Sequence, residues 1–217
     1  TTRNLVEALP AGTDTTLCST SAIGYYGDRG EDILTEDEPP GEDILTEDEP
    51  PGDDFLAEVG RDWEKEALQA ESKGARVVLT RYGIVLHRNG GAMAKMIPAF
   101  RMFVGGPLGS GRQWFSWIHM RDLLNAYQFV IDRPDVRGPL NYCAPEPVRN
   151  QRLSKTLATK LNRPAAIKAP AFMVKLVLGE FGKVLLQSQR VRPAALEQAG
   201  FEFEYADIDS ALEQIVS

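Results

Sequence analysis

Residues that build disulfide and metal sites are scarce in this 217-residue chain, which has two cysteines and two histidines. A disulfide framework or a structural metal site needs more ligands than Cys18 and Cys143 offer, so we expect two buried thiols and no metal. The chain also lacks the run of about 18 uncharged apolar residues that crosses a membrane. Charged residues interrupt the most apolar stretch, 169–186. Because we recognise no signal peptide either, we expect a cytoplasmic protein.

A basic block is also missing, and the acidic residues are unevenly distributed. The formal net charge is −7, but ten carboxylates lie between residues 31 and 49, and without them it would be +3. The rest of the chain is therefore close to neutral. Without a basic stripe, the sequence does not predict a nucleic-acid partner. We expect a small-molecule substrate and neither a nucleic acid nor a membrane as partner.

The acidic segment contains a repeat, because residues Gly30–Pro40 recur without a change as Gly41–Pro51. Two copies are too few for a repeat architecture. We interpret them as a tandem duplication inside a surface loop, residues 28–54, where added length costs little closure entropy. A divalent-cation site on the paired acids is the alternative. Repulsion between like charges and four prolines favour an extended, solvated segment instead.

The hydrophobic pattern predicts alternating strands and helices, which is typical of an α/β protein with a parallel sheet. The expected strands are Thr15–Ile23, Ala75–Leu86, Trp114–His119 and Pro139–Cys143. The expected helices are Thr2–Leu9, Phe55–Ser72, Gly91–Phe103, Asp122–Ile131, Asn150–Leu161, Pro170–Gln187, Pro193–Ala199 and Ile208–Val216. We expect Asp122 and Asn150 to cap helices and Trp63 to pack in the core. The apolar stripe of 170–187 is expected to pack against the body, with a groove for a partner as the alternative.

Two strand ends carry candidate ligand-binding residues. Ser19, Thr20 and Ser21 end the first strand, and ligands of open α/β sheets bind beyond the carboxyl ends of strands. Their hydroxyls either bind a ribose or a substrate, or satisfy backbone groups as the strand turns. At the end of the next strand, Gly83 permits a ligand to approach the backbone closely. Residues 89–91 then open a helix suited to an anion, although we favour a plain turn there.

The glycine-rich segment 105–111 superficially resembles a phosphate loop. A dinucleotide-binding loop follows a strand and opens a helix, whereas this segment leads into the expected strand 112–119. Arg112 remains a candidate clamp for an anion. His119 is either a proton shuttle or a satisfied core histidine. Glu64 is either a surface acid or an inward-facing polar group.

Several motifs occur in one order along the chain: residues 19–28, 45–56, 61–64, 81–86, 90–96 and 105–119. In this order the sequence resembles the 39U-type epimerase-family proteins, an atypical branch of the extended short-chain dehydrogenases/reductases. Residues Ile167 to Ile215 resemble the C-terminal helical segment of that branch. The resemblance covers nearly the whole chain except one copy of the repeat.

The resemblance implies a Rossmann-like, doubly wound parallel sheet that binds NADP, with a mostly helical C-terminal region on the substrate side. The family's glycine-rich loop lies before the position that corresponds to Thr1, so we expect only the C-terminal strands of the sheet and impaired NADP binding. We expect three regions. Residues 1–90 belong to the nucleotide-binding part, 91–166 form a substrate-side region with a returning strand and helix at 112–132, and 167–217 form the helical segment.

The resemblance also shows what the active centre lacks. Extended members use a Ser or Thr, a Tyr and a Lys four residues after the Tyr, and the Lys lowers the pKa of the Tyr hydroxyl. Ala22, Gly60 and Glu64 stand at these three positions. A carboxylate at position 64 is expected to raise the pKa of a neighbouring tyrosine such as Tyr25 or Tyr26. Ordinary Tyr–Lys chemistry is therefore not expected.

Site residues follow from these motifs and the resemblance. Ser21, Tyr25 and His119 are the catalytic candidates, and Arg112 and Gln113 are the substrate candidates. The NADP-binding candidates are Ser19, Ser21, Tyr82, Gly83 and Val85. The expected function is that of an NADP-linked epimerase- or reductase-like protein. The alternative is a non-catalytic nucleotide sensor or regulator, which loosely fits the cell-division-inhibitor label of some bacterial relatives.

Overall fold

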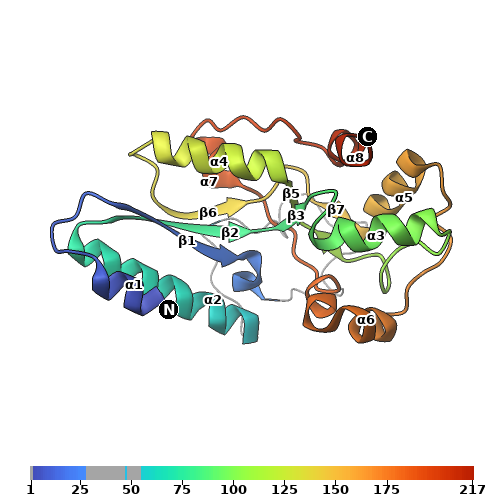
Figure 1. The fold of residues 1–217 in the computed structure, drawn as a ribbon, viewed down its shortest axis with the longest axis horizontal. Coiled ribbons are helices and arrows are strands. Elements are labelled where there is room, and N and C mark those ends of the chain that lie inside the picture. Colours follow the sequence, from blue (N-terminus) through green and yellow to red (C-terminus); the bar gives the residue numbers. More distant parts are fainter. Residues whose placement is uncertain (1, 28–46, 48–54) are drawn as a thin grey trace, which may run out of the picture.

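The computed structural model describes residues 2–27, 47 and 55–217 (Figure 1). The acidic duplicated segment therefore lies outside the described residues, except for Glu47. The helices are α1 (Thr2–Ala8), α2 (Phe55–Leu68), α3 (Gly91–Arg101), α4 (Met120–Asp132), α5 (Asn150–Leu161), α6 (Ala171–Val184), α7 (Ala194–Gln198) and α8 (Ile208–Val216), with 3-10 turns η1 (Ile23–Tyr26) and η2 (Gln69–Lys73). The strands are β1 (Thr16–Ala22), β2 (Arg76–Tyr82), β3 (Ile84–Leu86), β4 (Trp114–Phe115), β5 (Trp117–His119), β6 (Gly138–Tyr142) and β7 (Val148–Arg149).

A parallel sheet in the order β1–β2–β6 forms the centre of the fold. Helices α1 and α2 lie on one side of it and α4 and α7 on the other (Figure 1). The middle strand β2 is buried on both faces: Val77 and Leu79 pack with the α1 and α2 side, and Val78 packs with residues of α4 and α7. A strand buried on both faces reads as a continuous apolar run in the sequence. The expected α/β fold with parallel strands is confirmed.

The expected strand 75–86 is divided at Gly83, where the chain changes partners. The backbone N–H of Gly83 donates to Tyr142 O, whereas that of Ile84 donates to Ser116 O. A Cβ at position 83 would lie 3.0 Å from Ser116 O and 3.2 Å from Cys143 Cβ. Glycine thus permits the close approach of β6 and β5 to this point. The expected strand 114–119 is likewise two short strands: β4 pairs antiparallel with β7, and β5 pairs parallel with β3.

A second core lies beside the small sheets, where α3, α5 and α8 surround Trp117 and Phe115. The glycines of segment 105–111 serve its packing. A Cβ on Gly105 would overlap the Phe100 ring at 2.3 Å, and one on Gly106 would lie 2.1 Å from Ile167 O. The segment leads into β4, so the prediction that it is not a dinucleotide-binding loop is confirmed.

Two predictions about helix caps are wrong. The N-cap of α4 is His119, whose Nδ1 accepts a hydrogen bond from the Arg121 N–H. Asp122 lies within α4, is buried, and accepts hydrogen bonds from the backbone N–H groups of Glu204 and Tyr205. Asn150 is the first residue of α5, and its Oδ1 accepts from Leu108 N. Both polar side chains therefore accept hydrogen bonds from segments that are distant in the sequence, and neither caps a helix.

Two predictions about burial are also wrong. Trp63 is 51% exposed, because α2 turns its smaller residues, such as Ala57 and Gly60, toward the interior. Only part of the α6 stripe is covered: Val174 is buried, whereas Leu176 and Val177 are 81% and 74% exposed. Both cysteines are free thiols: Cys143 is buried as expected, and Cys18 is half-buried. No helix in the described ranges is long and apolar enough to cross a membrane.

Candidate functional site

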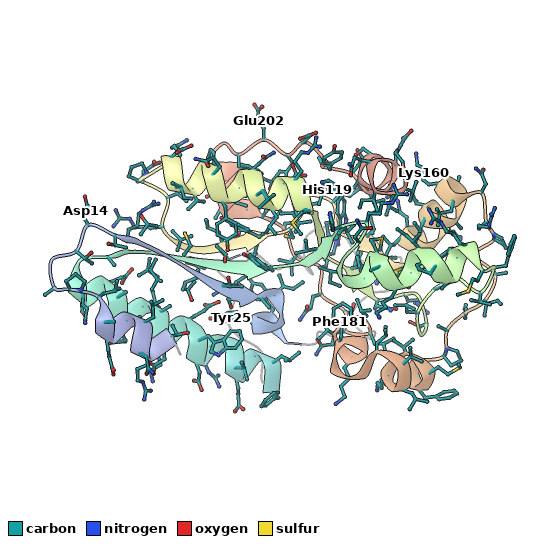
Figure 2. The ribbon with its side chains drawn as sticks, viewed as in Figure 1. Asp14, Tyr25, His119, Lys160, Phe181 and Glu202 are labelled. Carbon is teal, nitrogen blue, oxygen red and sulfur yellow. The ribbon has the colours of Figure 1, made fainter. Side chains whose placement is uncertain are left out.

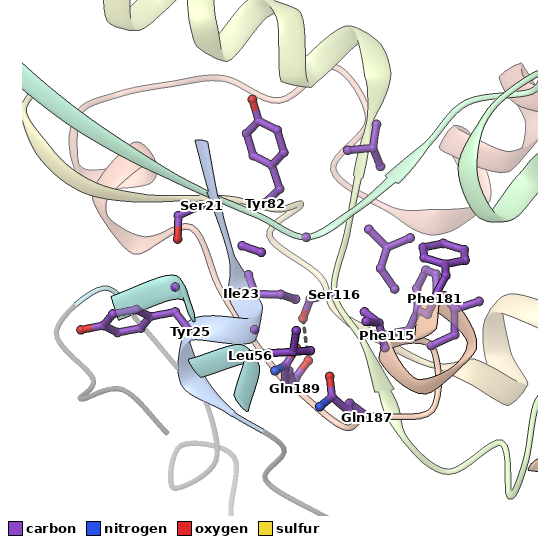
Figure 3. Close-up of a pocket in the computed structure, with 18 of the residues that line it drawn as sticks. Ser21, Ile23, Tyr25, Leu56, Tyr82, Phe115, Ser116, Phe181, Gln187 and Gln189 are labelled. Carbon is purple, nitrogen blue, oxygen red and sulfur yellow. Dashed lines mark hydrogen bonds between the residues drawn. The ribbon is translucent and has the colours of Figure 1, made fainter. Parts of the chain in front are cut away.

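A cavity of about 560 Å³ opens at the carboxyl ends of β1 and β2 (Figure 3). Its wall is mostly apolar and comes from five parts of the chain: residues 20–25, four residues of α2, residues 82–85 with 91–92, residues 114–116, and residues of 181–189. Parallel strands place their carboxyl ends at one edge of a sheet, and this edge is where ligands bind in open α/β folds. The cavity therefore stands where the sequence predicted a ligand.

Ser21 is the polar group of this wall that most needs a partner. Its side chain is 3% exposed, and its hydroxyl has no hydrogen-bond partner among the described residues. Buried hydroxyls are nearly always paired, so an unpaired one at a cavity marks a place where a ligand can complete the bonding. Ser19, two residues earlier on β1, does not line the cavity. Its carbonyl accepts from the Thr80 hydroxyl at 3.3 Å.

Three further candidates lie at the end of β2 and in β3. Tyr82, Gly83 and Val85 all line the cavity. The ring of Tyr82 points away from the side of the sheet where Tyr25 lies, as Figure 3 shows. It stacks on Tyr142, and its hydroxyl bonds that of Tyr127. Burial and the bond to Tyr127 raise the pKa of Tyr82 to about 12. Tyr82 therefore belongs to the cavity wall, and its hydroxyl is engaged by Tyr127.

A buried ion pair lies beside the cavity and involves Glu64. Arg81 Nε and Nη2 donate to the two carboxylate oxygens of Glu64, each at 2.8 Å. The guanidinium carbon lies 3.6 Å from the centroid of the Tyr25 ring. Arg81 Nη1 donates to the Tyr26 hydroxyl, which donates to Asn141 Oδ1 at 2.8 Å. Of the two interpretations of Glu64, the inward-facing polar group is confirmed.

Burial and the contacts within this network shift the pKa values of Arg81 and Tyr26. Burial opposes the charge of Arg81, but the hydrogen bond to Glu64 and the nearby Tyr26 raise its pKa overall. Burial raises the pKa of Tyr26, against the effect of Arg81. The expected rise of a tyrosine pKa therefore occurs at Tyr26, but burial causes it. The charge of Glu64 is compensated by Arg81.

Tyr25 lies against Gly60, which stands at the position of the missing tyrosine. A Cβ on Gly60 would lie 3.4 Å from Tyr25 Cα and 3.5 Å from its Cβ. The backbone of η1 thus packs directly on α2 at this residue. Tyr25 lines the cavity, but no lysine belongs to the described residues of the wall. The sequence predicted that a Tyr–Lys pair is missing. At position 60, where the tyrosine would stand, η1 packs against the glycine.

The other candidates are not part of this cavity. His119 Nε2 bonds Gln214 Oε1 at 2.9 Å while Nδ1 caps α4, and burial lowers its pKa. The description of His119 as a satisfied core histidine fits this position. Arg112 is exposed. Gln113 is buried, and its Nε2 donates to Leu108 O and Leu185 O. None of these three residues therefore contacts the cavity, and their predicted catalytic and substrate roles gain no support from it.

Three polar wall residues were missed in the sequence: Ser116, Gln187 and Gln189. The Ser116 hydroxyl donates to Gln189 O at 2.7 Å, the contact drawn in Figure 3, and accepts from Val191 N. Gln189 Nε2 donates to Gly27 O at 2.7 Å and so ties this wall to the end of η1. A sequence signal existed: a polar run, residues 187–190, separates the apolar helix from Pro193. In Figure 2, His119 lies near α8, whereas Tyr25 lies on the side of the sheet that α2 covers.

The parallel sheet and the cavity at its carboxyl edge define a Rossmann-like protein. Known proteins agree with this class. The human epimerase family protein SDR39U1 (isoform 2), solved with NADPH, is 30% identical, with a TM-score of 0.82 over 99% of this chain and 70% of that chain. A nucleoside-diphosphate sugar epimerase from Corynebacterium glutamicum is 38% identical, with a TM-score of 0.75 over 99% of this chain and 40% of that one.

Sequence comparison gives the same result. The chloroplastic epimerase family protein SDR39U1 homolog of Arabidopsis thaliana is 42% identical over 214 residues, which are 98% of this chain and 58% of that protein. A family model described as a domain of unknown function, DUF1731, matches residues 169–215. The chain thus belongs to the epimerase family of SDR39U1-type, extended short-chain dehydrogenase/reductase-like proteins. It spans little more than half the length of the Arabidopsis relative.

Proposed function

We propose that the cavity beside Ser21 receives the nicotinamide end of NADP, and that the protein is an NADP-linked member of the epimerase and reductase type. One observation carries the proposal: Ser21, which lines a cavity at the carboxyl ends of two parallel strands, has a buried hydroxyl with no partner among the described residues. The presence of NADPH in the human relative supports the choice of cofactor.

The cavity suits a flat, partly polar ring. Ile23, Val85 and Phe115 supply apolar walls, and Ser21 supplies a hydrogen-bonding group without a protein partner among the described residues. NADP exchanges a hydride with a substrate when it is bound. The part of this chain is to orient the ring and to exclude water around it. Ser21 holds the nicotinamide ring by a hydrogen bond, and Tyr25 closes the neighbouring wall of the cavity.

The 217-residue polypeptide is expected to bind NADP weakly by itself. High affinity for the pyrophosphate comes from a glycine-rich loop that follows a strand and opens a helix. The glycine-rich segment 105–111 precedes a strand and packs against Phe100 and Ile167. The nicotinamide side is therefore the part of the cofactor site that these residues supply.

The second candidate function is a nucleotide sensor without turnover, and the ion pair favours it. Position 64 carries a carboxylate neutralised by Arg81, and position 60 has no side chain. Without a Tyr–Lys pair, the cavity lacks the usual group that moves a proton to or from a substrate. The Ser21 and Tyr25 hydroxyls are the groups available to an enzyme here.

Fluorescence titration of NADPH into the full 217-residue chain tests the binding proposal. We expect Ser21→Ala to weaken binding several-fold, because it removes the one hydrogen bond that we assign to the ring. The matched control is Ser19→Ala, on the same strand but outside the cavity. Equal NADPH affinity of the wild type and Ser21→Ala would contradict the proposal. Ser21→Ala removes no hydrogen bond of the described structure, so folding should be preserved.

Turnover separates the two functions. NADPH is mixed with carbonyl compounds and nucleotide sugars, and its absorbance is followed. Consumption that Ser21→Ala abolishes and Ser19→Ala retains supports the enzyme. Binding without consumption of any substrate supports the sensor.

A further inference from the structure

A second cavity, of about 520 Å³, lies where β4 and β7 meet the segment after α6. Its lining differs from that of the first cavity, because four arginines contribute to it: Arg149, Arg152, Arg190 and Arg192. Trp114 lines both cavities. These four arginines do not belong to the nucleotide site that the family resemblance implies. None of them was a candidate from the sequence.

Carboxylate partners within the described part of the chain are seen for Arg152 and Arg192. Arg152 binds Glu146 at 2.8 Å and lies 3.6 Å from Asp209, and Arg192 binds Glu197 at 3.0 Å. Arg149 Nη1 donates to the carbonyl of Arg112. Arg190 differs from them, since no hydrogen-bond or ion-pair partner belongs to it among the described residues. Its charge is therefore available to a ligand of opposite sign.

Three residues that line this cavity each carry a buried hydrogen-bond donor without a partner among the described residues. Trp114 Nε1, Arg190 Nε and Arg192 Nε are buried and have no acceptor within the described part of the chain. All three atoms are donors and none is an acceptor. Because buried polar groups in folded proteins are nearly always paired, such a set calls for a ligand rich in acceptor oxygens. Phosphate is the common group with this property, and guanidinium groups bind it through two parallel hydrogen bonds.

The arginines are held in place before a ligand arrives. The guanidinium carbons of Arg149 and Arg190 lie 4.0 and 4.4 Å from the centroid of the Trp114 indole ring. The antiparallel pairing of Trp114 with Arg149 sets one of these contacts, and the bond from Trp114 N to Ser188 Oγ helps to set the other. Stacking on an aromatic ring orients a guanidinium at little further entropy cost on binding.

We propose that this cavity binds the phosphate group of a small molecule, with Arg190 as its principal contact. Arg149 and the Trp114 indole position the guanidinium of Arg190 and flank the anion. The proposal is independent of NADP binding, because its probes carry no nicotinamide.

Calorimetric titration of the full chain with inorganic phosphate tests the proposal, at constant ionic strength to hold charge screening fixed. Glucose 1-phosphate forms a second arm, and tighter binding of this compound than of phosphate identifies a phosphorylated organic molecule as the ligand class. We expect saturable binding that Arg190→Gln weakens about tenfold or more. The matched control is Arg101→Gln, which removes one charge from the exposed end of α3, outside the cavity.

A further variant, Arg190→Lys, distinguishes loss of the guanidinium group from a general loss of folding. Arg190→Lys keeps the charge but loses the planar fork, so we expect an affinity between those of wild type and Arg190→Gln. Absence of binding to wild type at about 20 mM phosphate, well above a millimolar dissociation constant, overturns the proposal. So does equal weakening by Arg190→Gln and Arg101→Gln, because that result reflects net charge alone.

Discussion

Glu64 and Arg81 form a bidentate ion pair with both nitrogen–oxygen distances at 2.8 Å, and their side chains are 7% and 4% exposed. The pair joins α2 to β2 beside the first cavity, and the rings of Tyr25 and Tyr26 lie near its guanidinium. The carboxylate at a position where other extended members have a catalytic lysine thus has a structural partner in this chain.

Breaking this pair should be costly. Glu64→Ala leaves a buried, uncompensated Arg81, and removal of one partner from a buried pair destabilises proteins by about 3–5 kcal/mol. Urea denaturation followed by circular dichroism measures the loss. Glu66→Ala is the control on the same helix, because Glu66 pairs with Arg3 at the surface and its loss should change the free energy of unfolding very little. Similar losses for both variants would contradict a special role of the buried pair.

Repairing the missing pair of catalytic residues should not create an enzyme. In the double variant Gly60→Tyr, Glu64→Lys, a side chain at position 60 meets Tyr25 at 3.4 Å, and a lysine at position 64 faces Arg81. The first change brings a large ring against Tyr25, and the second places two like charges together in a buried site. We expect a lower thermal midpoint than that of wild type and no new NADPH consumption. A stable double variant with turnover would show that the η1 contact and Arg81 adapt freely.

The sequence predicted the parallel strands, the edge of the sheet that holds the cavity, and Ser21 as a wall residue, because these depend on local apolar runs and on general rules for α/β sheets. It left Glu64 undecided, since its partner Arg81 lies on another element. Gly83 was expected to face a ligand, but tight packing on Ser116 and Cys143 also requires glycine there. His119 caps α4 in place of Asp122, whose carboxylate instead accepts from the N–H groups of Glu204 and Tyr205 in the C-terminal segment.

His119 should make stability depend on pH. Burial lowers its pKa in the folded state, although Asp122, Glu204 and Gln214 act against this and Arg121 adds to it. The unfolded chain then binds more protons than the folded one, so the free energy of unfolding falls as the pH decreases from about 6.5 through the lower folded-state pKa.

His119→Asn tests this effect, because asparagine is a good helix cap but does not titrate. Unfolding free energies of both proteins are measured between about pH 5 and pH 7.5, the range around the histidine pKa. We expect the difference between wild type and variant to shift against the wild type as the pH decreases. Parallel pH profiles would mean that His119 has the same pKa in both states.

Deleting one copy of the acidic repeat, Gly41–Pro51, should leave the thermal midpoint almost unchanged. Glu47, the described residue of this copy, accepts a hydrogen bond from the Asn141 N–H at 2.9 Å, and its carbonyl accepts a longer one from Arg81 Nη1 at 3.4 Å. One such bond contributes about 1 kcal/mol, and the identical first copy supplies Glu36 as a replacement. Differential scanning calorimetry measures the outcome. A decrease of several degrees would show that the second copy is packed in a way that the first cannot reproduce.

The most direct test of the cofactor proposal uses reduced nicotinamide mononucleotide, the half of NADPH that the first cavity should receive. Amide chemical shifts of the ¹⁵N-labelled chain are recorded during its titration, in wild type and in Arg190→Gln, which removes the proposed phosphate contact. The account predicts shifts at Ser21, Gly83 and Val85 in both proteins and smaller ones in Ser21→Ala. No change at these three residues, or changes only around Trp114 that disappear in Arg190→Gln, would contradict it.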